Sequence, residues 1–318
     1  MKATLVSVII PSAGQAPSLQ RCLDSLSPQA LEGGIEVVVA LDGGVAMQAA
    51  AIQQLRARSD WPWLLRWVDL DTRCGPAVPR NRAAAEARGR YFIFLDDDMI
   101  AAPDFVAAHL ELLAQNLGAA VVGAIKTRCD GYSGAYGYSI EKFWDARHDR
   151  LTREPNMSFR DCFGGNLSMA REVFQRIGGF DESIPACEDL EFGLRLARAD
   201  VRLLYGPRAL SVQLHRKAPS DMMRDCEVRG LAYVRLWRSY PEARRTITFA
   251  RRRTRWLTRL ALSTRWRCES LAFILPWLPA THLTYFFYMF LCEVAEARGA
   301  RREFADADQW TALTEDSN

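Results

Sequence analysis

The stretch Tyr91–Met99 has the sequence Tyr-Phe-Ile-Phe-Leu-Asp-Asp-Asp-Met, a run of large apolar residues followed by three adjacent carboxylates. The apolar half predicts a strand that is buried on both faces of a sheet. Asp96, Asp97 and Asp98 follow that strand directly, and the carboxyl ends of strands form the ligand crevice of α/β sheets. Two carboxylates one residue apart can hold a hard divalent ion. The alternative interpretation is a solvated acidic turn, since Asp is common in turns.

Strand-like and helix-like patterns alternate along the first part of the chain. Buried strands are predicted at residues 5–11, 36–40, 64–68 and 91–95, with helices at 18–26, 45–58 and 75–88 between them. This alternation predicts an α/β fold with helices on both faces of a sheet. Further helices are expected at residues 103–116, 171–177 and 187–196, and further strands at 119–125, 163–169, 201–205 and 209–215. The stretch 126–160, rich in Gly, Tyr and charge, is expected to be a long irregular substrate loop.

The composition is typical of a globular protein with an ample core. The chain has 318 residues, of which 49% are hydrophobic and 25% charged, and its net charge is +3. A net charge this small gives no reason to expect a nucleic-acid partner for the whole molecule. The eight cysteines form no Cys-x-x-Cys pair and have no metal-like spacing with histidine, so we expect reduced thiols. Because residues 1–4 also show no signal-peptide pattern, we expect a cytoplasmic protein.

Several motifs, taken in order, resemble the family 2 glycosyltransferases of the GT-A fold. The resemblance covers roughly residues 5–216, and it rests on Val6–Pro11, Asp42-Gly43-Gly44, residues 77–90, Leu95–Asp98, Gly164-Gly165-Asn166, Gly178–Asp181 and Glu188-Asp189. It implies a GT-A type, Rossmann-like mixed sheet flanked by helices. It also implies that residues 1–218 form the catalytic domain that binds a nucleotide sugar, followed by a helical C-terminal extension over residues 219–318.

The same resemblance implies roles for individual residues. Asp96, Asp98 and His215 would hold a divalent metal ion, Mn²⁺ or Mg²⁺, which neutralises the departing diphosphate. Asp189 would be the base that takes the proton from the acceptor hydroxyl, with Glu188 beside it. The residues that would bind the nucleotide-sugar donor are Pro11, Ser12, Asp42, Arg80, Asp96, Asp97, Gly165 and Asn166.

Structural interpretations stay open for some of these residues. Glu188 and Asp189 would also suit the first turn of a helix, where acids complement the helix dipole. In that interpretation Glu191 pairs with Arg195 at i,i+4 spacing. A lone histidine such as His215 is in many proteins simply a satisfied polar residue.

The nucleotide base is the point where the motif pattern departs from the family. Asp42 matches the carboxylate that accepts a hydrogen bond from the base, but Leu41 and Gly44 stand where the family has Asp and Ser. Because the matched carboxylate is retained, uridine is the expected base and a UDP-sugar the expected donor. Arg80 is expected to reach the diphosphate, and a solvated helix face is the alternative for this residue.

The C-terminal part of the sequence is strongly basic and then strongly apolar. Between residues 244 and 267 there are many arginines and no acid, with Trp and Leu interleaved, a composition typical of a helix on an anionic membrane surface. The apolar run Leu271–Cys292 is interrupted by Pro276 and Pro279, so two shorter helices fit better than one spanning helix. An ordinary helical cap on the catalytic domain is the alternative. Nucleic-acid binding is not expected, because no recognition motif accompanies the charge.

These features together predict a metal-dependent, inverting glycosyltransferase. It would move a sugar from a nucleotide sugar to a hydroxyl of a glycan, a lipid-linked acceptor or another cell-envelope intermediate, in the cytoplasm or on the inner face of the membrane. A processive synthase is not expected, because Arg252–Trp256 has Arg where the Gln-x-x-Arg-Trp motif needs Gln. Two alternatives are an inactive GT-A-fold scaffold that acts through its arginine-rich tail, and a nucleotidyltransferase. The second would need a basic glycine-rich loop after the first strand, and Ser12–Ser18 contains no Lys or Arg.

Overall fold

The computed structural model describes residues 5–29, 34–43, 49–129, 131–245, 247 and 268–303. The chain divides into two compact units. The first contains residues 1–128, 144–184 and 188–214, and the second contains residues 129–143, 185–187 and 215–318. The first unit is built around a sheet and the second around helices.

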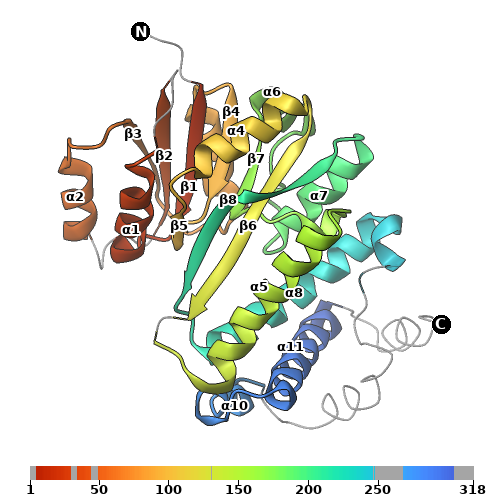
Figure 1. Cartoon of the computed structure of the whole chain (residues 1–318). Coiled ribbons are helices and arrows are strands. Elements are labelled where there is room, and N and C mark those ends of the chain that lie inside the picture. The colour runs from red at the N-terminus through yellow and green to blue at the C-terminus, as the bar shows by residue number, and fades with distance from the viewer. Residues whose placement is uncertain are drawn as a thin grey trace. The chain divides into compact units, whose positions relative to one another are not determined.

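Eight strands form one mixed sheet (Figure 1), in the order β3-β2-β1-β4-β7-β6-β8-β5. Their bounds are β1 Val6–Ser12, β2 Ile35–Asp42, β3 Leu64–Leu70, β4 Tyr91–Leu95, β5 Met99–Ala101, β6 Ala120–Cys129, β7 Asn166–Ala170 and β8 Leu203–His215. Strands β3, β2, β1 and β4 run parallel, whereas β7 is antiparallel to both β4 and β6, and β5 is antiparallel to β8. The strands predicted in the first part of the chain form the parallel half of the sheet.

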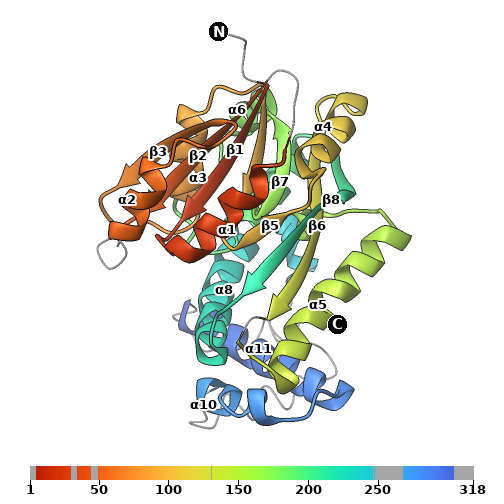
Figure 2. The ribbon, with the colours of Figure 1, turned by 60° about the vertical axis from the view of Figure 1, so that its left-hand side comes forward.

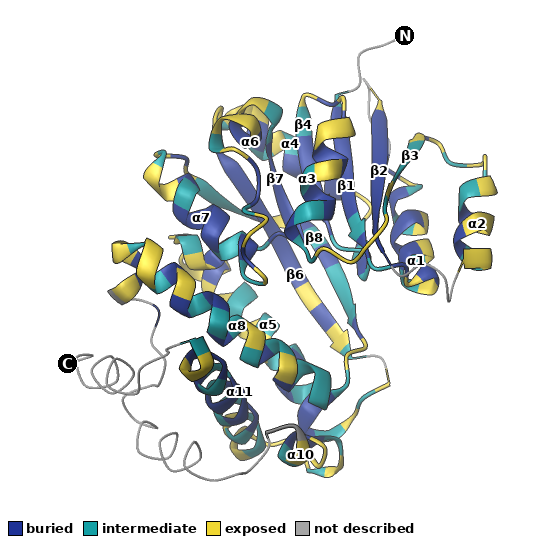
Figure 3. Ribbon diagram, turned by 180° about the vertical axis from the view of Figure 1, so that it is seen from behind, coloured by how far each residue is buried: buried dark blue, intermediate teal, exposed yellow. Residues whose placement is uncertain are grey.

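Helices cover both faces of this sheet (Figure 2). One core contains residues of α1 (Ala16–Leu26), α2 (Ala49–Ala57) and α4 (Phe105–Gln115), and the other contains residues of α3 (Ala77–Glu86), α6 (Arg171–Ile177) and α7 (Glu188–Arg198). Strand β1 shows how the two cores share one strand, because Val8 and Ile10 belong to the first core and Ile9 to the second. All three side chains are fully buried, as expected for a central parallel strand. Figure 3 shows most of β1 in the colour of buried residues. The predicted fold class, a mixed sheet flanked by helices, is confirmed.

The parallel half of the sheet brings three predicted site segments to one edge. In the register, Ser12 at the end of β1 lies opposite Leu41, next to Asp42 at the end of β2. On the other side of β1, Ile9 lies opposite Phe94, so β4 ends at the same edge, at Leu95, directly before Asp96. The carboxyl ends of β1, β2 and β4 therefore converge, as the position of a ligand crevice requires.

The prediction of an irregular loop over residues 126–160 is wrong. Strand β6 continues to Cys129, and α5 is a helix over Gly134–Arg153, followed by the short 3₁₀ helix η2 at Phe159–Asp161. Tyr136 and Ile140 are both buried one helical turn apart. The segment thus has an apolar stripe that its content of glycine, tyrosine and charge concealed.

The two strands predicted at residues 201–205 and 209–215 are one continuous strand, β8. Pro207 lies within this strand, although proline cannot donate a ladder hydrogen bond. Strand β5, however, pairs with β8 only from Ser211 to Gln213. Pro207 lies outside that pairing, so its missing N–H costs no hydrogen bond to β5.

The second unit is built on two long helices that pack closely. They are α8 (Pro219–Ser239) and α11 (His282–Glu303), accompanied by η3 (Pro241–Arg245), α10 (Cys268–Ala272) and η4 (Leu275–Trp277). The break between η4 and α11 agrees with the two shorter helices predicted around the prolines. Gly230 and Gly299 let the backbones approach, because a Cβ at either residue would lie less than 3.0 Å from a carbonyl oxygen of the opposite helix.

Within the described ranges, no helix has both the length and the apolar character needed to cross a bilayer. Most of the predicted basic amphipathic helix, residues 246 and 248–267, falls outside the described part of the chain.

Candidate active site

The three adjacent aspartates form a tight turn at the end of β4. The N–H of Met99 donates to the carbonyl oxygen of Asp96 at 3.1 Å, which closes the turn, and β5 begins at Met99. The N–H of Asp96 donates to the carbonyl oxygen of Gly165 at 3.2 Å, just beyond the pair formed by Leu95 and Asn166. The predicted acidic motif and the predicted Gly-Gly-Asn motif therefore meet side by side at one edge of the sheet.

Each aspartate side chain has a different partner. The pairs are Arg80 Nη2 to Asp96 Oδ1 at 2.5 Å, Ser12 Oγ to Asp97 Oδ2 at 2.5 Å, and Gln213 Nε2 to Asp98 Oδ2 at 3.0 Å. Desolvation raises the pKa of Asp97 to about 6, although the hydrogen bond from Ser12 opposes the shift. Neighbouring residues thus give three consecutive carboxylates three distinct environments.

Arg80 connects the acidic turn to the predicted base motif. Its side chain is only 5% exposed, although α3 covers a face of the sheet. Nη2 pairs with Asp96, and Nη1 donates to Glu188 Oε1 at 2.7 Å and to the carbonyl oxygen of Pro76 at 3.0 Å. The solvated helix face considered for this residue is therefore wrong. Arg80 instead forms a buried ion-pair bridge between two segments that are far apart in the sequence.

Glu188 and Asp189 begin α7 and differ in what surrounds them. Burial raises the pKa of Glu188 to about 7, with Arg80 lowering it and Asp189 adding to the rise. Asp189 is less enclosed, and its two oxygens accept hydrogen bonds from the N–H groups of Gly164 at 3.2 Å and Leu190 at 2.8 Å. Burial raises the pKa of Asp189 as well, against the effect of those bonds. Asp189 is thus the less buried acid of the pair, held in place by backbone donors.

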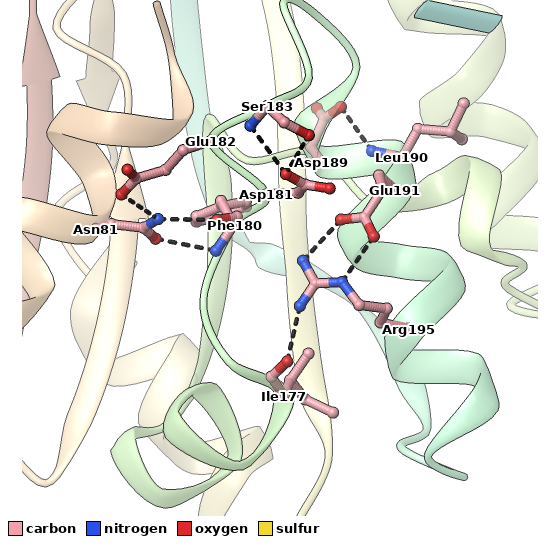
Figure 4. A network of polar contacts seen from close by, with 10 residues as sticks. All are labelled: Asn81, Ile177, Phe180, Asp181, Glu182, Ser183, Asp189, Leu190, Glu191 and Arg195. Atoms are coloured by element: carbon pink, nitrogen blue, oxygen red, sulfur yellow. Dashed lines mark hydrogen bonds and ion pairs between the residues drawn. The ribbon is translucent and has the colours of Figure 1, made fainter. Parts of the chain in front are cut away.

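A polar network holds the end of α6 and the segment that follows it against α7 and α3 (Figure 4). The amide of Asn81 donates to the carbonyl oxygen of Phe180 at 2.8 Å and accepts from its N–H at 2.9 Å. Further along, Arg195 binds both carboxylate oxygens of Glu191 at 2.7 Å and the carbonyl oxygen of Ile177. The expected i,i+4 pair between Glu191 and Arg195 is present. Glu188 and Asp189 take no part in it and contact Arg80 and the N–H of Gly164.

Comparison with known proteins identifies the family. Residues 7–178 match the family described as glycosyl transferase family 2, which is more than half of the chain. The chain belongs to this family. It is 31% identical over 282 residues to the uncharacterized glycosyltransferase YfnE of Bacillus subtilis, covering 72% of this chain and 69% of that protein. It is also 27% identical to validoxylamine A glucosyltransferase of Streptomyces hygroscopicus, covering 70% of this chain and 60% of that protein. The predictions of a family 2 glycosyltransferase and of enzymatic activity are confirmed.

A solved structure of similar fold supports the same architecture. The mannosyltransferase PcManGT from Pyrobaculum calidifontis, in complex with GDP-Man and Mn²⁺, aligns with a TM-score of 0.62 at 17% sequence identity. The alignment covers 95% of this chain and 87% of that structure. At this level of identity the likeness shows the GT-A fold of the glycosyltransferase.

The acidic turn of this glycosyltransferase suits a hard divalent ion. In the described ranges no group of three or more His, Cys, Asp or Glu side chains gathers around one point. Mg²⁺-like ions, however, are commonly held by one or two carboxylates together with substrate phosphates. The Asp96 side chain is 33% exposed, and Gly165 keeps space beside its Oδ2, since a Cβ there would lie less than 3.0 Å from that oxygen. The carboxylates of the acidic turn therefore fit an ion whose other ligands are oxygens of a diphosphate.

His215, the third predicted metal ligand, falls in the second unit. Its Nε2 lies 2.8 Å from the hydroxyl of Tyr136, and that hydroxyl donates to the carbonyl oxygen of Lys217 at 3.0 Å. Because a tyrosine has one hydroxyl proton, Nε2 is assigned as the donor to Tyr136, which leaves Nδ1 with the lone pair. Burial lowers the pKa of His215 to about 4, so the ring is neutral.

Asn166, predicted to bind the donor, lies inside the sheet of this enzyme. Its Nδ2 donates to the carbonyl oxygens of Ala124 and Ala209, and to Ser211 Oγ, at 3.0 to 3.1 Å. Its Oδ1 lies 2.9 Å from Nε2 of His109, which is fully buried. In this structure the amide of Asn166 joins β7 to β6 and β8.

Asp42, predicted to read the base, is buried at the end of β2. Its Oδ1 accepts a hydrogen bond from the N–H of Cys74 at 2.6 Å. Gly43 follows with φ +58°, and a Cβ there would lie less than 3.0 Å from the backbone of Thr72 and Arg73. The turn after β2 therefore needs glycine at this position, and Asp42 is held against residues 72–74.

Gln213 is the site residue that the sequence analysis missed. It lies on β8 and donates to Asp98, one of the two carboxylates predicted to hold the metal. The sequence could have indicated this residue. Gln213 is two residues from His215, a predicted metal ligand on the same predicted strand, and residues at that spacing lie on one face of a strand.

Proposed function

We propose that this family 2 glycosyltransferase is a metal-dependent, inverting enzyme. It transfers a sugar from a nucleotide sugar, with UDP as the expected nucleotide, to a hydroxyl of a glycan or lipid-linked acceptor of the cell envelope. Residues 1–218 are the proposed catalytic domain. The observation that carries the proposal is Arg80, whose buried guanidinium binds both Asp96 and Glu188 and so couples a carboxylate turn to a second carboxylate pair.

On the donor side, Asp96 and Asp98 are the proposed ligands of Mn²⁺ or Mg²⁺, with His215 as a third candidate. The bound ion supplies a Lewis acid that neutralises charge on the departing diphosphate. Gly165 leaves room beside Asp96 for a ligand, and the mannosyltransferase PcManGT was solved with Mn²⁺. Pro11, Ser12 and Asp97 would line the same edge of the sheet, where Ser12 fixes the Asp97 carboxylate.

On the acceptor side, Asp189 is the proposed general base. The N–H groups of Gly164 and Leu190 orient its carboxylate, and its raised pKa strengthens it as a proton acceptor near neutral pH. Glu188 is more buried and is paired with Arg80, so we assign it a positioning role. Among the described residues we place one base and no second nucleophile, which corresponds to a single displacement that inverts the anomeric centre.

The first experiment tests the base. In Asp189→Asn, transfer to acceptor should fall by about a hundredfold or more, while stabilisation by the donor nucleotide is retained, because a general base contributes on that scale and does not bind the nucleotide. Glu182→Gln is the matched control, since Glu182 is an exposed acid that precedes α7 and binds Asn81. Unchanged turnover in Asp189→Asn would remove Asp189 as the base.

The second experiment tests donor and metal. Melting temperatures are measured with UDP, GDP and dTDP, each with and without Mn²⁺, because a ligand of the folded state raises the melting temperature. We expect metal-dependent stabilisation by UDP that is lost in Asp98→Asn. Stabilisation by GDP alone would transfer the proposal to a GDP-sugar, as in the ligand of PcManGT. No shift with any nucleotide would overturn the proposal.

A further inference from the structure

An uncharged segment of the second unit exposes an unusual number of large apolar side chains. No charged residue occurs from Ser270 to Cys292. Five side chains in this segment are strongly exposed, namely Phe273 (71%), Ile274 (43%), Trp277 (81%), Leu283 (78%) and Phe286 (64%). Soluble surfaces carry single exposed apolar residues routinely, whereas a concentration of them in one short segment points to an interaction surface. These five residues are called the apolar patch below.

The apolar patch is the outer side of an ordered structure. Leu275 and Tyr288 belong to the same segment and are buried, so the chain here has both an inner and an outer face. The link between η4 and α11 is fixed by the hydroxyl of Thr284, which donates to the carbonyl oxygen of Pro279 at 2.8 Å. The exposed residues are thus presented by a well-defined turn and the first turns of α11, which Figure 3 shows beside α10.

A cation and two tyrosines lie at the edge of the apolar patch. Lys142 Nζ lies 2.7 Å from Nδ1 of His282, the residue before Leu283. The same ammonium group is 5.1 Å from the ring centres of Tyr138 and Tyr285. Aromatic rings with a polar end, together with lysine, are the side chains found at the headgroup level of membranes.

The sequence that precedes the apolar patch supplies the charge. Arginine occurs at positions 244, 245, 251, 252, 253, 255, 259, 265 and 267, and no acid lies among them. Arg267 is followed directly by Cys268, where α10 begins. Each basic residue near an anionic bilayer strengthens binding about fivefold. This charge pattern favours a negatively charged lipid surface over a second copy of the chain, which would bring like charges together.

We propose that the apolar patch docks this protein on an anionic lipid bilayer, with the exposed rings and Leu283 inserted at the headgroup boundary. The charge of the arginine-rich sequence before the patch favours this negatively charged surface. The protein would lie on the membrane as an interfacial protein. This proposal involves neither the metal ion nor the base, so it can be tested independently of the proposed reaction.

The test is co-sedimentation of the full chain with vesicles. One set contains phosphatidylcholine alone, and the other equal amounts of phosphatidylcholine and phosphatidylglycerol. We expect binding to the anionic vesicles that weakens with added salt. In Trp277→Ser/Phe286→Ser the partition coefficient should fall by roughly tenfold to a hundredfold, because two large exposed rings no longer enter the lipid. Leu64→Ser and Leu117→Ser, at exposed leucines of the first unit, are the matched controls and should bind as the wild type does.

Two further readouts make the result decisive. Melting curves and the donor-nucleotide shift of Trp277→Ser/Phe286→Ser should equal those of the wild type, since both side chains are exposed. Size-exclusion chromatography then separates membrane docking from self-association. Absence of binding to anionic vesicles, equal binding by patch and control variants, or a wild-type dimer that dissociates in the patch variant would each overturn the proposal.

Discussion

Replacing Arg80 by methionine is the sharpest test of the buried bridge between the two carboxylate groups. Methionine has a similar length but no charge, so Asp96 and Glu188 both lose their partner. Asp96 is 33% exposed and can be solvated by water, whereas the Glu188 side chain is 7% exposed and cannot. The cost of the substitution therefore falls on Glu188.

The magnitude depends on whether Glu188 stays charged. Breaking a buried pair while the remaining charge persists costs about 3–5 kcal/mol. Glu188 can avoid this cost by taking up a proton. Burial already raises its pKa from 4.5 to about 7, and loss of Arg80 raises the pKa further. A carboxyl whose pKa is raised by folding binds its proton more tightly in the folded state. Stability then falls as pH rises between the unfolded and folded pKa, by about 1.4 kcal/mol per pH unit.

In the wild type the loss attributable to Glu188 ends at about pH 7, where its folded pKa lies. In Arg80→Met the loss continues above about pH 7 and reaches roughly 3 kcal/mol relative to the wild type. Below about pH 7 the difference in unfolding free energy between the variant and the wild type becomes smaller, because Glu188 is protonated in both proteins.

The assay is urea unfolding of wild type and variant at a series of pH values on both sides of neutrality. Arg82→Met is the matched control, since Arg82 lies on the exposed side of the same helix. The double variant Arg80→Met/Glu188→Gln should recover stability at alkaline pH, because no buried charge remains. Curves for Arg80→Met and wild type that run parallel above neutrality, or an equal loss in Arg82→Met, would refute the bridge as described.

Two further substitutions test close approaches in the two units. Gly165→Ala should abolish transfer and the metal-dependent nucleotide shift with little loss of folding, because its Cβ would displace the Asp96 carboxylate; retained nucleotide binding would contradict this. Gly230→Ala should lower the unfolding free energy by about 2–3 kcal/mol, since overpacking against the carbonyl oxygen of Glu296 outweighs the gain of about 1 kcal/mol in helix propensity. Circular-dichroism melting checks the second substitution, and a variant more stable than the wild type would show that α8 and α11 can separate at little cost.

The sequence predicted the fold well where the pattern is local and repeated. Buried β-formers in Tyr91–Leu95 and the matching strands before it were enough for a parallel half-sheet. It failed at α5, where Gly134 and Gly137 suggested a loop. Each glycine there meets a backbone carbonyl oxygen, of Pro276 or Tyr132, at a distance that no Cβ could occupy. Those glycines are required by close packing, and only the folded chain shows it.

The sequence by itself also determined the family, and with it the chemistry to look for, because Asp96, Asp98 and Asp189 belong to motifs whose order along the chain is characteristic. Only the tertiary structure decided how these groups are coupled. Arg80 and Glu188 are 108 residues apart and yet form one buried ion pair. Periodicity records which face of an element is apolar, and it carries no information about which distant side chain meets which. That choice is made by packing and by the need of a buried charge for a partner.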